Sequence, residues 1–250
     1  YKRQVYQQYI SDTPTTIVSN LKDDGYTCIA MHPYYETGWS RNLVYPHIGF
    51  DEMHFIDYFD QTKILREYIT DQELYDKIIK RYENRKNNEK LFFMGITMQN
   101  HGGYTETYDN FPENYYKVGR SYTDANQYLS LVHESDEAVK NLISYFSKVD
   151  DPVEIIFFGD HQPSLNSNFY PILNGKGLTG LTEDELEKLY TVPFFIWTNY
   201  DTPEETVDIT SLDYLSTMAL ERAGIELPAY NKFLACLLYT SPSPRDGLLS

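Results

Sequence analysis

Polar side chains that could do chemistry follow directly after three apolar stretches of this sequence. They are His32, the pair Asn100-His101 and the pair Asp160-His161. An imidazole transfers protons near neutral pH, and imidazole and carboxylate groups both bind divalent metals. In an open α/β sheet, ligands bind beyond the carboxyl ends of the strands. If the apolar stretches are strands, the pattern predicts a metal or phosphate site at one edge of a sheet.

The pair Asp160-His161 is the sharpest of these features. A hard carboxylate beside an imidazole suits a divalent metal such as Mn or Zn. Adjacent residues reach one metal only if the backbone turns sharply, which Gly159 and Pro163 allow. The competing interpretation is a turn that faces solvent and carries an ordinary Asp–His pair.

His101 stands between Asn100 and the pair Gly102-Gly103. Two glycines let a ligand approach the backbone closely. From this position the imidazole could hydrogen-bond a phosphate oxygen or protonate a leaving group. The competing interpretation is a histidine that caps the end of a strand through backbone contacts, and the sequence leaves both open.

A segment containing Gly38 brings Trp39 close to Arg41. An arginine guanidinium holds an anionic oxygen with a planar fork of donors. Without further context, the local pattern favours the alternative, a tryptophan that anchors a loop while the arginine lies on the surface. The surrounding residues 34–58 are aromatic and irregular, and we expect a loop with short turns there.

Apolar runs and helical periodicity alternate along the chain. Residues 89–98 are apolar throughout, as a buried parallel strand would be, and residues 121–147 have the spacing of a long amphipathic helix. A first helix is expected between a candidate N-cap at Thr13 and a stop at Gly25. The alternation predicts one α/β domain with a mostly parallel central sheet flanked by helices. We expect strands at residues 26–31, 89–98, 153–158 and 192–197, and helices at residues 13–24, 71–85, 121–147 and 210–224.

The composition excludes several classes of protein. The 250 residues include 21 Lys and Arg against 37 Asp and Glu, and the net charge of −16 argues against wrapping nucleic acid or docking of the protein surface on anionic lipid head groups. Two cysteines, Cys28 and Cys236, exclude a disulfide scaffold and a cysteine-based zinc site. No stretch approaches the ~18 consecutive apolar residues of a transmembrane helix.

The last residues differ from the rest of the sequence. After Leu234 the helical pattern stops, and Ser and Pro alternate in the phrase SPSPRD. This phrase resembles translated cloning or sequencing-adapter text. We therefore expect residues 235–250 to be a non-native tail outside the domain.

Together these motifs resemble the extracellular catalytic domain of the lipoteichoic acid synthase family, within the sulfatase and alkaline phosphatase superfamily. The Gly-Asp-His turn is shared widely in the superfamily, whereas the Trp-x-Arg and Asn-His elements are more specific to this branch. The resemblance covers about residues 10–234 and implies an α/β fold of the alkaline phosphatase and sulfatase type. It rests on His32, Trp39-Ser40-Arg41, Tyr45 and residues 48–51, 97–101, 158–163, 193–201 and 228–234.

The resemblance implies a role for each matching residue. Asp160 and His161 match the family's metal ligands, so the cofactor would be Mn²⁺ or another divalent metal. His101 would be a catalytic residue that also contacts the substrate. The positions that would line the site for the glycerol-phosphate group are His32, Trp39, Arg41 and His101.

The resemblance also implies that part of the site lies outside this chain. The family's nucleophilic threonine and its other metal carboxylate lie upstream of any motif present here. Thr13, Thr15 and Thr16 fall at the start of the first helix and do not match the nucleophile. We expect residues 1–234 to be an N-terminally truncated sulfatase-like catalytic domain, and this chain to be inactive alone.

The implied function is that of a metal-dependent phosphoglycerol transferase for lipoteichoic acid-type cell-envelope polymers. The donor would be phosphatidylglycerol or another phosphoester, and the acceptor a polymer or glycolipid. The domain would work at the outer face of the cell membrane, with its anchor outside this chain, and no nucleic acid would take part. Two alternatives remain: a sulfatase or phosphoester hydrolase of the same fold, and a non-catalytic binder of anionic cell-surface polymer.

Overall fold

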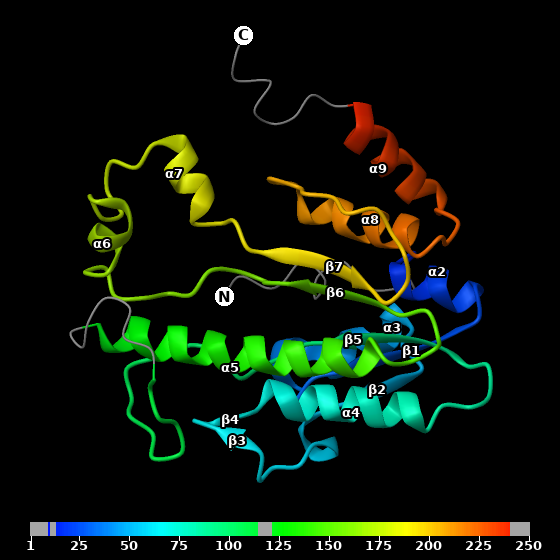
Figure 1. Ribbon diagram of the computed structural model, residues 1–250, viewed down its shortest axis with the longest axis horizontal. Helices are drawn as coiled ribbons and strands as arrows, with labels where there is room; N and C mark the ends of the chain where they lie inside the picture. The colour runs from blue at the N-terminus through cyan, green and yellow to red at the C-terminus, as the bar shows by residue number, and fades with distance from the viewer. Residues whose placement is uncertain (1–9, 11–13, 115–121, 241–250) are drawn as a thin grey trace. The chain divides into compact units, whose positions relative to one another are not determined.

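The computed structural model describes residues 10, 14–114 and 122–240 (Figure 1). The chain divides into two compact units, which are described separately. Unit 1 consists of Tyr1–Lys148 and Gly159–Val192, and unit 2 consists of Val149–Phe158 and Pro193–Ser250.

Unit 1 is built on a three-stranded parallel sheet. Its middle strand β1 (Tyr26–Met31) pairs with β2 (Glu52–His54) on one side and β5 (Lys90–Gly95) on the other. The last four residues of β1 are buried because neighbours cover the strand on both edges. Parallel pairing of the first two expected strands is thus confirmed. β5 is only half-buried, which corrects the expectation of a fully buried strand: it has one strand neighbour among the described residues.

Two long helices run side by side along this sheet (Figure 1). Helix α4 (Asp71–Glu83) begins where the Thr70 side chain accepts a hydrogen bond from the Glu73 amide. It packs so closely on β5 that a Cβ at Gly95 would lie 3.2 Å from Ile78 Cδ1. Helix α5 (Thr123–Phe146) is amphipathic and buries one face, as its spacing predicts.

The first helix is shorter than the sequence indicates. Helix α2 (Ile17–Asp23) begins at Thr16, whose side chain and the side chain of Ser19 form a reciprocal capping box. Thr13, the expected N-cap, lies outside the described residues. The helix ends as expected at Gly25, which has a φ of +83°.

Residues 34–58 contain regular structure, so the expectation of a loop is wrong. A 3₁₀ turn η1 (Gly38–Ser40) leads into helix α3 (Arg41–Ile48), followed by β2 and a second 3₁₀ turn η2 (Ile56–Tyr58). Helix α3 has only eight residues and contains Pro46, so its periodicity is hard to detect. Its buried side chains nevertheless fall at i, i+3 and i+4, at Arg41, Val44 and Tyr45.

The remaining elements of unit 1 are short. Strands β3 (Ile64–Leu65) and β4 (Tyr68–Ile69) form a hairpin whose two-residue loop begins at Arg66, with a φ of +56°. A positive φ at the first loop position is the pattern of a type II′ turn, which usually has glycine there. Helices α6 (Tyr170–Asn174) and α7 (Glu183–Lys188) follow late in the chain.

Unit 2 corrects two sequence expectations. Strands β6 (Glu154–Phe158) and β7 (Phe194–Thr198) pair antiparallel with each other, so they are not further parallel strands. An apolar run indicates burial but does not encode the direction of its partner. Beyond η3 (Leu212–Tyr214) and α8 (Leu215–Arg222), helix α9 (Ala229–Thr240) continues past Leu234, where the helical pattern was expected to stop.

The assignment of residues 235–250 as a non-native tail stays a prediction. Six of these residues belong to α9, and residues 241–250 lie outside the described part. The single catalytic domain at residues 1–234 also stays a prediction. None of the helices in the described ranges has the length and apolar character needed to cross a membrane.

Candidate functional site

Trp39 is the centre of the candidate site in unit 1. Its ring centroid lies 5.9 Å from that of His32 and 6.0 Å from that of His101, both at edge-on angles. The guanidinium carbon of Arg41 lies 4.5 Å from the centroid of the indole, in a cation–π contact. The structure therefore brings together all four residues expected to line the substrate site.

The local backbone presents Trp39 in an unusual way. Trp39 and Ser40 have φ values of +53° and +58°, in the left-handed region that non-glycine residues rarely adopt. Gly38 packs under the Tyr34 ring, and a Cβ there would come within 3.0 Å of Tyr34 Cδ1. Strained, well-packed backbone of this kind is typical of functional sites.

Arg41 lies inside the protein, contrary to the surface alternative. The residue is 9% exposed, and its Nε donates to Tyr45 Oη at 3.0 Å. Its Nη1 donates a long bond of 3.4 Å to the Gly38 carbonyl. Nothing in the described part of the chain accepts a hydrogen bond from Nη2. A buried guanidinium with a donor to spare is suited to binding an anionic oxygen.

His32 has a fixed tautomer. Its Nδ1 lies 2.9 Å from the carbonyl oxygen of Ile96, and because a carbonyl only accepts, Nδ1 carries the proton. Burial, chiefly, lowers the pKa of His32 to about 4, so the ring is neutral at pH 7. Nε2 is buried and has no hydrogen-bond partner among the described residues. It is therefore a lone-pair acceptor that suits a hydroxyl group.

His101 is exposed and held by contacts around its own segment. Its amide donates to the Met98 carbonyl at 3.0 Å. Nδ1 lies 3.2 Å from the Gly102 carbonyl oxygen and 3.4 Å from Tyr68 Oη. Nε2 is thus the ring nitrogen that remains for a ligand. Strand-end contacts and an accessible imidazole coexist, so the two sequence interpretations do not exclude each other.

Asp160 and His161 form an exposed pair in unit 1. Their side chains are 85% and 76% exposed, with His161 Nε2 at 3.4 Å from Asp160 Oδ2. The carboxylate and imidazole fit a divalent cation in their chemistry. The described residues contain no group of three or more potential metal ligands. At this position they therefore supply two ligands of a coordination shell that needs more.

Electrostatics relate Asp160 to the segment that carries His101. Burial, chiefly, raises the pKa of Tyr104 to about 12, and the charge of Asp160 adds to this rise. Asp160 likewise contributes, after burial, to a raised pKa at Tyr128. Tyr104 in turn donates to the Asn100 carbonyl at 2.7 Å. If one phosphate group with its metal bridges His101 and the Asp160–His161 pair, the two lie within about 10 Å of each other, and this distance is a prediction.

Sequence reasoning missed two groups of residues that support His101. Arg66 donates hydrogen bonds to the carbonyls of Gln99, His101 and Gly103. Asp71 and Ser135 form a buried pair, with 2.5 Å between Ser135 Oγ and Asp71 Oδ2. Asn100 Nδ2 and Gln99 Nε2 both donate to Ser135 Oγ, at 2.9 and 3.3 Å. No local signal in the sequence marks these partners, because the hydrogen-bonded residues are 33 to 64 positions apart along the chain.

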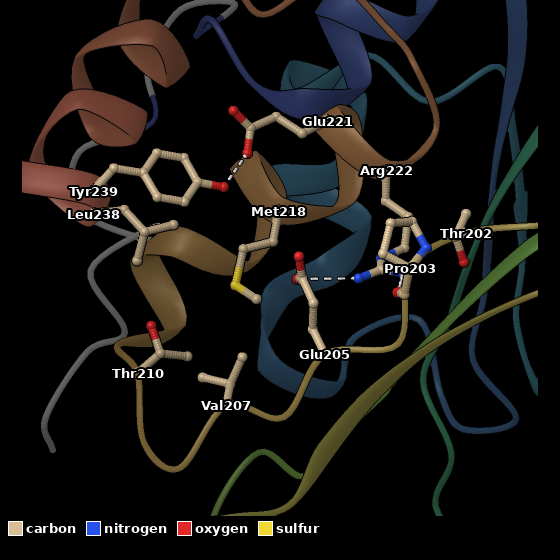
Figure 2. A pocket seen from close by; sticks show the side chains of 10 residues that line it. All are labelled: Thr202, Pro203, Glu205, Val207, Thr210, Met218, Glu221, Arg222, Leu238 and Tyr239. Atoms are coloured by element: carbon tan, nitrogen blue, oxygen red, sulfur yellow. Dashed lines mark hydrogen bonds and ion pairs between the residues drawn. The ribbon is translucent and has the colours of Figure 1, made fainter.

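A separate hollow of about 390 Å³ lies in unit 2 (Figure 2). An ion pair between Arg222 and Glu205 (3.2 Å) and a hydrogen bond from Tyr239 Oη to Glu221 (2.8 Å) cross its lining. None of the residues predicted for the site lines it. Tyr239 falls in the range expected to be a non-native tail, and here it packs against α8.

The chain belongs to the sulfatase family, whose sequence profile matches residues 1–225. It is 28% identical over 237 residues to a putative cyclic β-1,2-glucan modification protein of Rhizobium meliloti, a match that covers 92% of this chain and 36% of that protein. It is 30% identical over 146 residues to a lipoteichoic acid synthase of Staphylococcus saprophyticus, which covers 56% of this chain and 22% of the synthase.

Among solved structures, the fold is similar to that of the phosphoglycerol transferase GacH of Streptococcus pyogenes in complex with sn-glycerol-1-phosphate. The TM-score is 0.74 at 21% sequence identity, covering 98% of this chain and 63% of that one. The expected fold of the sulfatase and alkaline phosphatase superfamily is confirmed, as is the resemblance to lipoteichoic acid synthases. Two curated relatives match most of this chain, and the chain spans about a third of the length of each.

Proposed function

We propose that this chain contributes the substrate pocket of a metal-dependent phosphoglycerol transferase. The observation that carries the proposal is the placement of two complementary groups beside Trp39. His32 Nε2 is a buried acceptor for a hydroxyl group, and Arg41 Nη2 is a donor for an anionic oxygen. A phosphoglycerol group has hydroxyls at one end and a phosphate at the other, with a short carbon chain that the indole can cover.

The relatives support this choice of substrate. One is a lipoteichoic acid synthase, and the similar structure of a phosphoglycerol transferase holds sn-glycerol-1-phosphate. A third relative carries the name of a cyclic glucan modification protein, which supports a polymer or glycolipid as the acceptor. Phosphatidylglycerol or another phosphoester is the proposed donor. The proposed location is the outer face of the cell membrane, where such a lipid donor is accessible.

In the proposed mechanism, this chain binds the donor, stabilises negative charge on the phosphoryl group and supplies a proton to the leaving alcohol. Arg41 binds a phosphoryl oxygen and stabilises the negative charge that grows there in the transition state. His101, through Nε2, gives a proton to the leaving alcohol. The nucleophile is proposed to be the hydroxyl of a threonine upstream of the motifs in this chain, whose oxygen bonds to phosphorus as the bond to the leaving alcohol breaks. A hydroxyl group of the acceptor then displaces the threonine and gives its proton back to His101. Trp39 contacts both Arg41 and His101, and its indole forms an apolar wall that fixes the orientation of the substrate.

Asp160 and His161 are proposed as two of the ligands of a divalent cation, Mn²⁺ or another metal of similar chemistry. When bound, such a cation neutralises charge on the phosphoryl group. Its remaining ligands are expected outside the described residues.

The test is a transfer assay with the full-length gene product. Phosphatidylglycerol labelled in its head group is supplied with a glycan or glycolipid acceptor, and products are separated by mass. Labelled phosphoglycerol on the acceptor, with release of diacylglycerol, is the expected result. Release of free glycerol phosphate without transfer would instead identify a phosphoester hydrolase. Turnover of sulfate esters alone would identify a sulfatase, and binding without turnover a non-catalytic binder of anionic polymer.

A further inference from the structure

Arg66 makes an unusual set of contacts for a residue in a hairpin loop. It is 5% exposed although it occupies the β3–β4 turn with a positive φ. Its Nη2 donates to the carbonyls of Gln99 at 2.9 Å and His101 at 2.8 Å, and its Nη1 donates to the carbonyl of Gly103 at 2.9 Å. One guanidinium thus binds three alternate carbonyls of the segment that carries His101.

This convergence determines the shape of the segment. Carbonyls at residues 99, 101 and 103 all point toward one cation, so the backbone curves around the guanidinium. The guanidinium binds these carbonyls through two different nitrogens in a rigid plane, whereas a lysine ammonium has its three donors on one atom and cannot reproduce this geometry. Since the cation is buried, each of these charge-assisted bonds is costly to leave unmade.

Surrounding groups hold Arg66 itself in place. Gln127 Oε1 in α5 accepts from Nη1 at 3.1 Å, and Asn110 Nδ2 donates to the Arg66 carbonyl at 3.1 Å. The rings of Tyr68, Tyr104 and Tyr108 lie 5.4 to 5.9 Å from the guanidinium carbon. Tyr68 also contacts the His101 ring, with centroids 5.7 Å apart. The hairpin therefore reaches both the backbone and the side chain of His101.

We infer that Arg66 is a positioning residue for His101: it fixes the curvature of residues 99–103 and so directs the imidazole toward Trp39. The catalytic consequence of this inference rests on the proposed function, whereas its structural part does not. Arg66 itself does not touch the substrate.

The test compares Arg66→Lys with Arg85→Lys in the full-length protein. Arg85 is a matched control, because it also donates to a carbonyl, that of Tyr82 at 2.9 Å, and stacks on a tyrosine ring at 3.9 Å. Arg66→Lys is expected to lower kcat for phosphoglycerol transfer by roughly 10- to 100-fold, as a displaced catalytic group does, while Arg85→Lys leaves kcat near that of the wild type.

A double-mutant cycle separates positioning from general stability. If Arg66 acts through His101, Arg66→Lys should have little further effect in a His101→Ala background. If the fold-changes in kcat caused by the two substitutions instead multiply, Arg66 does not act through His101, and the inference is overturned.

Hydrogen exchange supplies a readout that does not depend on the reaction. Amides in residues 98–104 should exchange faster in Arg66→Lys than in the wild type or in Arg85→Lys. Unchanged exchange there would overturn the inference whatever the activity. If His101→Ala leaves transfer intact, the proposed role of His101 is wrong, and the exchange result still decides whether Arg66 fixes the segment.

A second variant covers the case in which Arg66→Lys does not fold. Gln127→Met removes the side-chain acceptor of Nη1 and keeps the volume of the side chain. It should produce a smaller change in the same direction, in kcat and in exchange of residues 98–104. Wild-type behaviour of this variant in both measurements would contradict the inference.

Discussion

The indole of Trp39 meets the imidazole of His101 edge to face, with ring centroids 6.0 Å apart and planes at 74°. The two residues are 62 positions apart in the chain: Trp39 comes after strand β1, and His101 comes after strand β5. The contact joins the segment before α3 to the segment after β5. It is the point at which two separate motifs of the sequence become one site.

Substitution of Arg41 by lysine should lower activity although the charge is kept. Lysine loses the planar fork, the bond from Nε to Tyr45 Oη and the stacking on Trp39. The expected cost in transition-state stabilisation is about 1–3 kcal/mol, the range for one charge-assisted hydrogen bond. Steady-state kinetics of the full-length protein give this value from kcat/KM. Wild-type kcat/KM in Arg41→Lys would mean that charge alone suffices or that Arg41 does not contact the phosphate.

Removal of the His101 imidazole should affect turnover more than folding. His101 is exposed, and its ring contacts Trp39 and Tyr68 at edge-on angles, so little packing is lost in His101→Ala. A lost proton donor typically costs on the order of 10²–10⁴ in rate. We expect kcat to fall by such a factor while the melting temperature and the metal content stay near the wild type. A lower melting temperature with normal activity of the folded fraction would identify His101 as a strand-end cap.

Acid should destabilise the fold through His32. Its pKa is lowered to about 4 in the folded state, from a model-peptide value of about 6.5, chiefly by burial. Between these values the unfolded chain binds the proton and the folded chain does not, so stability falls as the pH drops from 6.5 toward 4. The loss is on the order of 3 kcal/mol.

Urea unfolding at several pH values measures this dependence. In His32→Gln the side chain no longer titrates, so the slope of the unfolding free energy against pH should decrease over that range. An unchanged slope would mean that His32 is not the group responsible.

Loss of the Asp160 carboxylate should remove bound metal from the full-length protein. The side chain is 85% exposed and its nearest described partner is the adjacent His161, so Asp160→Ala should leave the fold intact. The content of divalent metal by elemental analysis is expected to fall well below that of the wild type. Asp150→Ala, at another exposed position, is the control. Undiminished metal in Asp160→Ala would contradict its role as a ligand.

Short motifs in the sequence singled out the residues of the candidate site, although the local pattern around Trp39 favoured a surface position for Arg41 and only the family resemblance placed Arg41 in the substrate site. A histidine after an apolar strand, a Trp-x-Arg triplet and a Gly-Asp-His turn each lie within a few residues, and so does the periodicity that defines α4 and α5. The parallel pairing of β1 with β5 also followed from apolar runs that alternate with helices.

Only the tertiary structure determined the features that depend on residues far apart in the sequence. The tautomer of His32 depends on the carbonyl of Ile96, 64 positions away, and the curvature around His101 depends on Arg66, 35 positions away. The antiparallel pairing of β6 with β7 was likewise not encoded in either strand alone. Local propensity acts within a turn or two of the chain, whereas hydrogen-bond partners and burial are fixed only when the folded backbone brings remote segments into contact.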